Sequence, residues 1–299
     1  MRIFITGASG LLGAALAAAA ARAGHRVIGT RNRGCERVPG VAVLHALDAA
    51  DEGAMHAALT AEPVDAIVNC AAVSSPPDCE RDPAGSRVIN VELPRRLAAF
   101  AAERGVRLVH VSSEQVFDGD GREPYAPGDA VAPRNVYGRQ KVEAEQAVAE
   151  LTQDGAAIVR PPLLVGDSLS GTRSLHEQLL AAWAAGQVPR LFTDEYRQPC
   201  GIGNLADVLL ALTVRRDLGG VFHWAGRDLV SRYELAERIR VRFGLPAERA
   251  PLAPVTRAEV PAVAAVRPQY LALDVTALEE RLGRRAQTLE AALAELYRR

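Results

Sequence analysis

The sequence lacks an excess of charge of either sign. Its 299 residues include 35 Lys and Arg and 36 Asp and Glu, for a formal net charge of -1. Binding to a phosphate backbone or an anionic bilayer usually needs a basic surplus, so we expect neither nucleic acid nor membrane as a partner. Hydrophobic residues make up 48% of the chain and charged residues 24%, which is typical of a folded globular protein and excludes a disordered or fibrous one.

Long apolar segments are also missing. The longest apolar run, residues 11–21, is far shorter than the roughly 20 residues that span a bilayer. Residues 1–6 enter a strand-like run directly, without the charged and apolar regions of a secretory signal. These observations predict a cytoplasmic protein.

Cysteine and histidine are too scattered for a metal or disulfide framework. The 4 cysteines form no CxxC pair, so we expect reduced thiols that are mostly buried. No two of the 6 histidines stand at metal-ligand spacing on one predicted helix face, so we expect no metal site.

The first half of the chain alternates short apolar runs with helical stretches. This pattern is typical of successive βα units and predicts an α/β fold with a Rossmann-like, doubly wound parallel sheet. We expect strands at residues 3–6, 26–29, 41–44, 66–70, 108–112 and 156–160. We expect helices at residues 12–23, 52–59, 83–104 and 136–151.

The pattern changes after residue 160. We therefore assign residues 1–160 to an NAD(P)-binding domain and residues 161–299 mainly to a smaller substrate-binding lobe, from which some segments return to the Rossmann core. Helices are expected at residues 175–185, 232–243 and 288–298. Residues 250–268 carry several prolines and little periodicity, which predicts a loop.

A glycine-rich turn lies between the first strand and the first helix. Gly7, Gly10 and Gly13 follow at three-residue intervals, as in turns that bring the backbone close to a pyrophosphate at a helix amino end. The position of the turn predicts a dinucleotide-binding site. The expected contacts in the turn are Gly7, Ser9, Gly10, Leu11, Leu12 and Gly13.

The end of the second strand indicates which dinucleotide fits. A carboxylate there would bind a ribose 2′-hydroxyl, whereas the sequence has Thr30, Arg31 and Arg33. We therefore expect NADPH rather than NADH, with Arg31 nearest the 2′-phosphate; a solvated basic loop is the alternative. Asp48, after the third strand, is expected near the adenine or as a helix cap.

Tyr137 and Lys141 are spaced to share one helix face. An adjacent ammonium, together with an oxidised nicotinamide, would favour the phenolate of a tyrosine used in acid–base catalysis. Ser112 and Ser113 stand at the carboxyl end of the fifth strand, where open α/β sheets bind ligands. We expect Ser113 to bind a substrate carbonyl together with Tyr137, with Ser112 as the alternative.

Several motifs resemble an extended short-chain dehydrogenase/reductase of the dTDP-4-dehydrorhamnose reductase branch. The resemblance runs nearly end to end. Its main segments are residues 6–13 (TGASGLLG), 69–72 (NCAA), 110–119 (HVSSEQVFDG), 135–141 (NVYGRQK) and 220–226 (GVFHWAG). Further segments are residues 197–199 (RQP), 204–207 (NLAD), 267–268 (RP) and 273–274 (LD).

The resemblance implies an activity and a set of site residues. It implies a Rossmann core, a Ser-Tyr-Lys triad of Ser113, Tyr137 and Lys141, and reduction of a nucleotide-linked 4-keto-6-deoxysugar with NAD(P)H. It also implies cofactor contacts at Ala71 and Ala72 and leaves a homodimer open.

The substrate pocket departs from the pattern of that branch. Glu114 and Gln115 replace the usual Asp and Tyr, and Leu163 stands in a segment that usually carries an aromatic residue. Arg197 and Arg267 are candidates for binding an anionic diphosphate, because a guanidinium matches phosphate geometry. Ion pairing at the surface is the alternative. The expected substrate residues are Ser112, Glu114, Gln115, Leu163, Arg197 and Arg267.

Two other functions remain open. The same segments are similar to the regulatory β subunit of methionine adenosyltransferase, which implies an NADP-binding partner protein without turnover. An epimerase or dehydratase on the same scaffold would need further acid–base groups, of which Glu114 supplies one.

Overall fold

A parallel sheet forms the centre of the molecule. The computed structural model describes residues 1–32 and 35–297, and its seven-stranded sheet has the order β11-β6-β5-β4-β1-β2-β3. The strands are β1 (Arg2–Thr6), β2 (Arg26–Arg31), β3 (Val43–Ala46), β4 (Ala66–Asn69), β5 (Arg107–Val111), β6 (Ala157–Arg160) and β11 (Gly220–His223). All neighbouring pairs are parallel. The order reverses between β1 and β4, which places a ligand-binding crevice at their carboxyl ends and confirms the predicted fold class.

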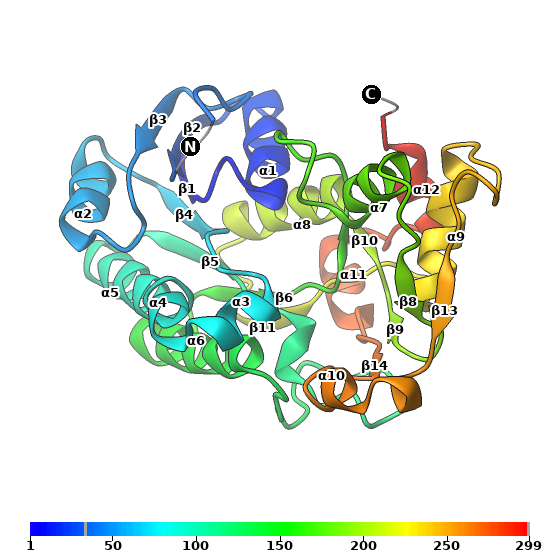
Figure 1. The fold of residues 1–299 in the computed structure, drawn as a ribbon. Helices are drawn as coiled ribbons and strands as arrows, with labels where there is room; N and C mark the ends of the chain where they lie inside the picture. Colours follow the sequence, from blue (N-terminus) through cyan, green and yellow to red (C-terminus); the bar gives the residue numbers. More distant parts are fainter. Residues whose placement is uncertain (33–34, 298–299) are drawn as a thin grey trace.

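Helices cover both faces of this sheet (Figure 1). On one face lie α1 (Leu11–Arg22) and α8 (Ile202–Val214), and on the other lie α2 (Glu52–Thr60), α5 (Leu93–Arg104) and α6 (Val136–Thr152). Ile3 and Ile5 of β1 pack in the core with α1 and α8, whereas Phe4 between them packs in the opposite core. Burial on both faces explains why the strand is a continuous apolar run.

The expected helix over residues 83–104 is interrupted. The structure has α4 (Pro83–Arg87), a π-helical turn (Val88–Glu92) and then α5, preceded by the unpredicted α3 (Pro76–Arg81). Asn90 in the π turn accepts a hydrogen bond from Val73 N (2.9 Å) and donates one to Gln140 Oε1 (2.8 Å). The irregular turn therefore supports the loop that follows β4.

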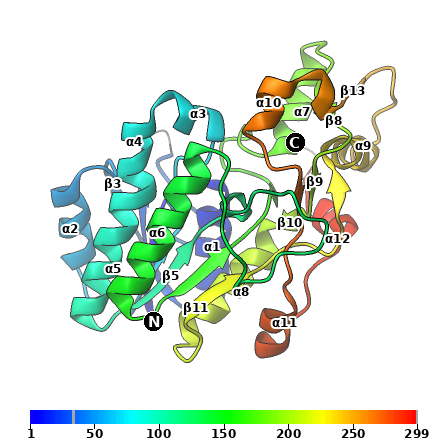
Figure 2. The ribbon, with the colours of Figure 1, turned by 90° about the horizontal axis from the view of Figure 1, so that it is seen from below.

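The carboxyl-terminal part divides between the sheet and a second lobe (Figure 2). Both α8 and β11 join the Rossmann core, and we use "second lobe" for the other residues after 161. Its helices are α7 (Leu175–Ala184), α9 (Arg232–Arg242), α10 (Pro261–Ala265), α11 (Thr276–Leu282) and α12 (Leu289–Ala294). Its strands are β7 (Leu164–Val165), β8 (Arg190–Phe192), β9 (Tyr196–Arg197), β10 (Cys200–Gly201), β12 (Val230–Ser231), β13 (Ala253–Val255) and β14 (Tyr270–Leu271).

The predicted loop over residues 250–268 is wrong in part. It contains β13, a 3-10 turn (Arg257–Glu259) and α10. Strand β13 forms by pairing with β8, and a short segment that contains Pro254 does not reveal this partner in sequence. Pro261 begins α10, where the N–H that proline lacks would have no partner within the helix.

Two further expectations concern cysteines and membrane spans. All four thiols are free; Cys79 and Cys200 are buried, whereas Cys35 and Cys70 are partly exposed. Within the described residues, no helix is long and apolar enough to cross a membrane.

Two glycines determine the turn between β1 and α1. Gly7 has a φ of +65°, and a Cβ there would lie 2.9 Å from Ala71 Cα. A Cβ on Gly13 would lie 2.2 Å from the carbonyl oxygen of Gly7. Helix α1 can approach the turn this closely only because Gly13 has no side chain.

We expect Gly13→Ala to lower the free energy of unfolding by about 1–3 kcal/mol, because the added methyl group must displace backbone. The matched control is Gly53→Ala in α2, where the nearest atom to the new Cβ is Asp51 Oδ1 at 3.6 Å. That control should gain about 0.4–1 kcal/mol from the smaller entropy of its unfolded chain. Urea unfolding of both variants measures the difference, and equal midpoints would contradict this account of Gly13.

Candidate active site

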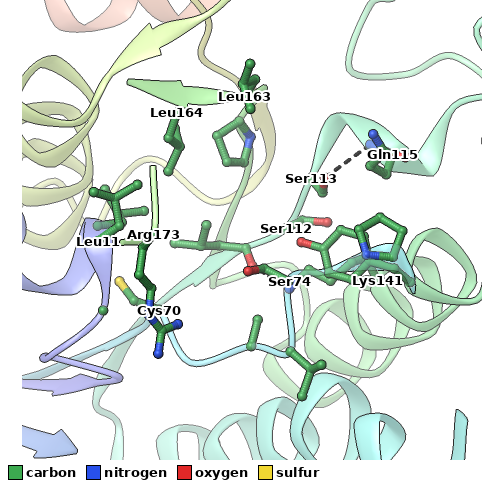
Figure 3. A pocket seen from close by; sticks show the side chains of 18 of the residues that line it. Leu11, Cys70, Ser74, Ser112, Ser113, Gln115, Lys141, Leu163, Leu164 and Arg173 are labelled. Carbon is green, nitrogen blue, oxygen red and sulfur yellow. Dashed lines mark hydrogen bonds between the residues drawn. The ribbon is translucent and has the colours of Figure 1, made fainter. Parts of the chain in front are cut away.

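A cavity of about 920 Å³ lies at the carboxyl edge of the sheet and is lined from both the Rossmann core and the second lobe (Figure 3). This volume is within the range of pockets that bind cofactors and small substrates. Residues of the glycine turn, the triad candidates and three arginines of β9, α9 and the segment before β14 share its wall.

One part of the cavity is suited to a dinucleotide. The amino end of α1 has no side-chain cap and no acidic residue in its first turn, so its N–H groups can bind an anion. Most of the predicted cofactor residues line this part. They are Gly7, Ser9, Gly10, Leu11, Leu12, Gly13, Thr30, Arg31, Ala71 and Ala72.

Of the residues expected near the adenosine end, Thr30 and Arg31 line the cavity and Asp48 does not. Thr30 Oγ1 accepts a hydrogen bond from Gly7 N (3.1 Å), and Arg31 lies at the end of β2 on the cavity wall. Arg33 lies outside the described residues. Asp48 is exposed and its carboxylate accepts from Ala50 N (3.0 Å); it neither caps α2 nor lines the cavity.

The structure brings Ser113, Tyr137 and Lys141 together on the cavity wall. Tyr137 and Lys141 are one turn apart on α6, which Asn135 caps by accepting from Gly138 N (2.8 Å). Lys141 is 1% exposed and its Nζ donates to Val111 O at the end of β5 (2.7 Å). Helix α6 and strand β5 thus fix these side chains relative to each other.

Burial controls the titration of both α6 residues. It raises the pKa of Tyr137 to about 12, partly offset by a hydrogen bond with Ser113, and it lowers the pKa of Lys141 to about 8. The expected lowering of the phenol pKa is therefore not found for the chain alone, because desolvation outweighs the hydrogen bond with Ser113. A phenol that keeps its proton at neutral pH is able to donate it.

The Ser112 hydroxyl is hydrogen-bonded to a buried ion pair between Glu145 and Arg160. It donates to Glu145, whose carboxylate also accepts from Arg160 Nε (2.9 Å) and Nη2 (2.6 Å). Ser113, whose Oγ accepts from Gln115 N (3.2 Å), lies outside this ion pair. Sequence reasoning missed Glu145 and Arg160, although Glu145 lies one turn beyond Lys141.

The two arginines predicted for diphosphate binding are neutralised by carboxylates. Arg197 lies 3.2 Å from both Glu114 and Glu195, and Arg267 makes two 2.7 Å hydrogen bonds to Glu195. The structure has ion pairing, but Arg197, Glu114 and Glu195 are buried rather than at the surface, and Arg267 is partly exposed. These four side chains form one ion-pair cluster on the wall of the cavity.

A third arginine, missed in sequence, differs from these two. Arg232, at the start of α9, lines the same cavity and makes no ion pair within 4 Å among the described residues. Burial lowers its pKa to about 10 and raises the pKa of Glu114 to about 8, although Arg197 opposes the shift of Glu114. Glu114 Oε2 is buried without a hydrogen bond among the described residues.

The remaining predicted substrate residues also reach the cavity. Gln115 lines it while its Oε1 accepts from Asn135 Nδ2 (3.0 Å), and Leu163 lines it opposite the triad candidates.

One group of side chains has a composition that could hold a metal ion. Asp167, His176 and Glu177 place one ligand atom each within 4.8 Å of one another. These side chains already bond one another or the neighbouring backbone. His176 Nε2 contacts Asp167 (3.1 Å), and Glu177 accepts a hydrogen bond from Ser168 N (2.7 Å).

We expect Glu145→Gln to destabilise the protein by about 3–5 kcal/mol, because it leaves Arg160 buried without a counter-charge. Their side chains are only 8% and 5% exposed. The control is Glu290→Gln. The side chains of Glu290 and its partner Arg238 are 66% and 41% exposed, so this substitution should lower the free energy of unfolding by less than about 1 kcal/mol. Urea unfolding separates the two, and an equal small loss in both variants would show that the buried pair contributes no more than a surface pair.

Comparisons with known proteins agree with this geometry. The probable low-salt glycan biosynthesis reductase Agl14 of Haloferax volcanii is 32% identical over 99% of this chain and 97% of that protein. Methionine adenosyltransferase 2 subunit beta of Xenopus tropicalis is 33% identical over 93% of this chain and 82% of that protein. The crystal structure of a dTDP-4-dehydrorhamnose reductase from Clostridium acetobutylicum ATCC 824 has a TM-score of 0.84 at 27% identity, covering 99% of this chain and 98% of that one. Residues 1–299 match the RmlD substrate binding domain, and the chain belongs to that family.

Proposed function

We propose that the chain is an oxidoreductase that uses NADPH to reduce the keto group of a nucleotide-linked 4-keto-6-deoxysugar. The observation that carries the proposal is that Ser113, Tyr137 and Lys141 line the same cavity as the glycine turn. The relatives support it, since they include Agl14 and a probable dTDP-4,6-dihydroxy-2-methyloxan-3-one 4-ketoreductase of Streptomyces antibioticus that is 34% identical over 80% of this chain.

The chain's own residues supply binding and proton transfer. A bound nicotinamide supplies the hydride that reaches the carbonyl carbon. Ser113 Oγ and the Tyr137 phenol donate hydrogen bonds to the carbonyl oxygen, and the phenol proton passes to that oxygen as the alcohol forms. The ammonium of Lys141, held by Val111 O, lies one helical turn from the phenolate left behind and stabilises it.

We expect Tyr137→Phe to lower kcat for keto-sugar reduction by about 10²–10⁴-fold, the usual contribution of a positioned proton donor. Its Kd for NADPH should stay within a few-fold of the wild-type value. The matched control is Tyr297→Phe, because Tyr297 is 75% exposed and outside the cavity. NADPH oxidation with a panel of nucleotide-linked 4-keto sugars measures the effect, and undiminished turnover in Tyr137→Phe would remove the phenol from the reaction.

The proposed preference for NADPH depends on Arg31. Arg31→Glu should raise the Kd for NADPH by about tenfold or more while changing that for NADH little, because only NADPH carries the 2′-phosphate. Arg37→Glu is the control, since Arg37 is exposed nearby but does not line the cavity. Nicotinamide fluorescence titrations give both constants for the wild type and for each variant, and an unchanged ratio of the NADPH and NADH constants in Arg31→Glu would place the phosphate elsewhere.

A cofactor-binding subunit without turnover is the second candidate. It is favoured by the identity of 31–33% to several methionine adenosyltransferase 2 beta subunits and by the neutralised state of Arg197 and Arg267. Tight NADPH binding together with no reduction of any keto sugar in the panel would favour this function over the reductase.

A further inference from the structure

We infer that Arg173, a residue of the second lobe, binds the diphosphate bridge of the dinucleotide across the cavity from the glycine turn. The inference rests on the proposed cofactor site and adds a contact from the opposite wall. It would make the second lobe part of the cofactor site as well as of the substrate site.

The side chain of Arg173 is placed to reach a ligand rather than the protein. It lies in the loop between β7 and α7, is exposed, and lines the same cavity as Leu11 and Cys70. In Figure 3 the side chain runs into the part of the cavity where Leu11 and Cys70 are drawn. Its guanidinium makes no hydrogen bond or ion pair with any residue in the described part of the chain.

The backbone that carries Arg173 is held firmly. Glu177 accepts hydrogen bonds from the backbone nitrogens of Arg173 (2.8 Å) and Ser174 (3.0 Å). Ser174 Oγ in turn bonds His176 Nδ1 (2.7 Å), and His176 is only 2% exposed. Because its backbone is already ordered, Arg173 can extend its long side chain to a ligand and lose little backbone entropy on binding.

The facing wall also favours an anion. The first turn of α1 presents N–H groups without a side-chain cap or an acidic residue, so its positive helix end faces the cavity. A diphosphate between this helix end and a guanidinium would satisfy both, because the guanidinium fork matches phosphate oxygens.

Two ligands of this site carry a diphosphate, the dinucleotide and the nucleotide sugar. We assign Arg173 to the dinucleotide because Leu11 and Cys70, which Figure 3 draws beside it, are the first residue of α1 and the residue after β4. The arginine left without an ion pair on the substrate side is Arg232.

The test uses Arg173→Gln in the full chain, with Arg249→Gln as the matched control. Arg249 is an exposed arginine of the same lobe that does not line the cavity. We expect the Kd of Arg173→Gln to rise about tenfold or more for NADPH, NADH and ADP-ribose alike, since all three share the diphosphate and a charge-assisted hydrogen bond is worth about 1.5–3 kcal/mol. Arg173→Lys should recover part of the loss, and Arg249→Gln should bind like the wild type.

Three results would overturn the inference. Unchanged dinucleotide affinity would exclude the contact, and a loss for NADPH alone would assign Arg173 to the 2′-phosphate. Weaker binding of dTDP or UDP with unchanged NADPH and NADH would assign it to the substrate diphosphate. All of these are binding measurements, so they test the inference even if no keto sugar is reduced. Equal urea midpoints for Arg173→Gln and Arg249→Gln establish that both variants are folded.

Discussion

The contact between one face of α6 and the ends of β5 and β6 is the constraint on which the site depends. Tyr137, Lys141 and Glu145 follow at four-residue spacing on this face. Lys141 bonds the backbone of β5, and Glu145 pairs with Arg160 at the end of β6. These two buried polar contacts therefore fix the rotation and height of the helix. They thereby also determine where the phenol of Tyr137 lies at the cavity end of the helix.

Charge is distributed unevenly around the cavity. On one side of the wall, Arg197 and Arg267 are paired with Glu114 and Glu195, although burial raises the pKa of Glu114 to about 8 and so weakens its charge near neutral pH. Arg232 is left over on that side, where burial without a direct partner is unfavourable until an anion binds. On this side of the cavity two of the three arginines are held by the protein's own carboxylates, which favours selection of a ligand by position over simple charge attraction.

The Rossmann half was predictable from sequence because most of its strands are apolar runs buried on both faces, and because a glycine turn follows β1. Gly7 and Gly13, with the spacing of Tyr137 and Lys141, located two parts of the cavity wall, the turn before α1 and one face of α6. The second lobe was not predictable to the same degree, because its two- and three-residue strands such as β9 and β14 form through partners distant in the chain. For the same reason the sequence could not reveal that Arg197 and Arg267 meet Glu195, or that Ser112 is held by Glu145; these depend on contacts between elements and not on spacing.

The π turn at Val88–Glu92 has a consequence for how this protein can tolerate changes in length. A π turn contains one more residue than a regular α-helical turn, so deleting a single residue there would produce an unbroken helix that looks more regular. The same deletion would rotate Asn90 away from Val73 and Gln140, and the loop at residues 71–74 would lose its support from the neighbouring helix. The π turn is thus a place where a change of one residue in length would alter the shape of the cavity, which its own Ile89 also lines.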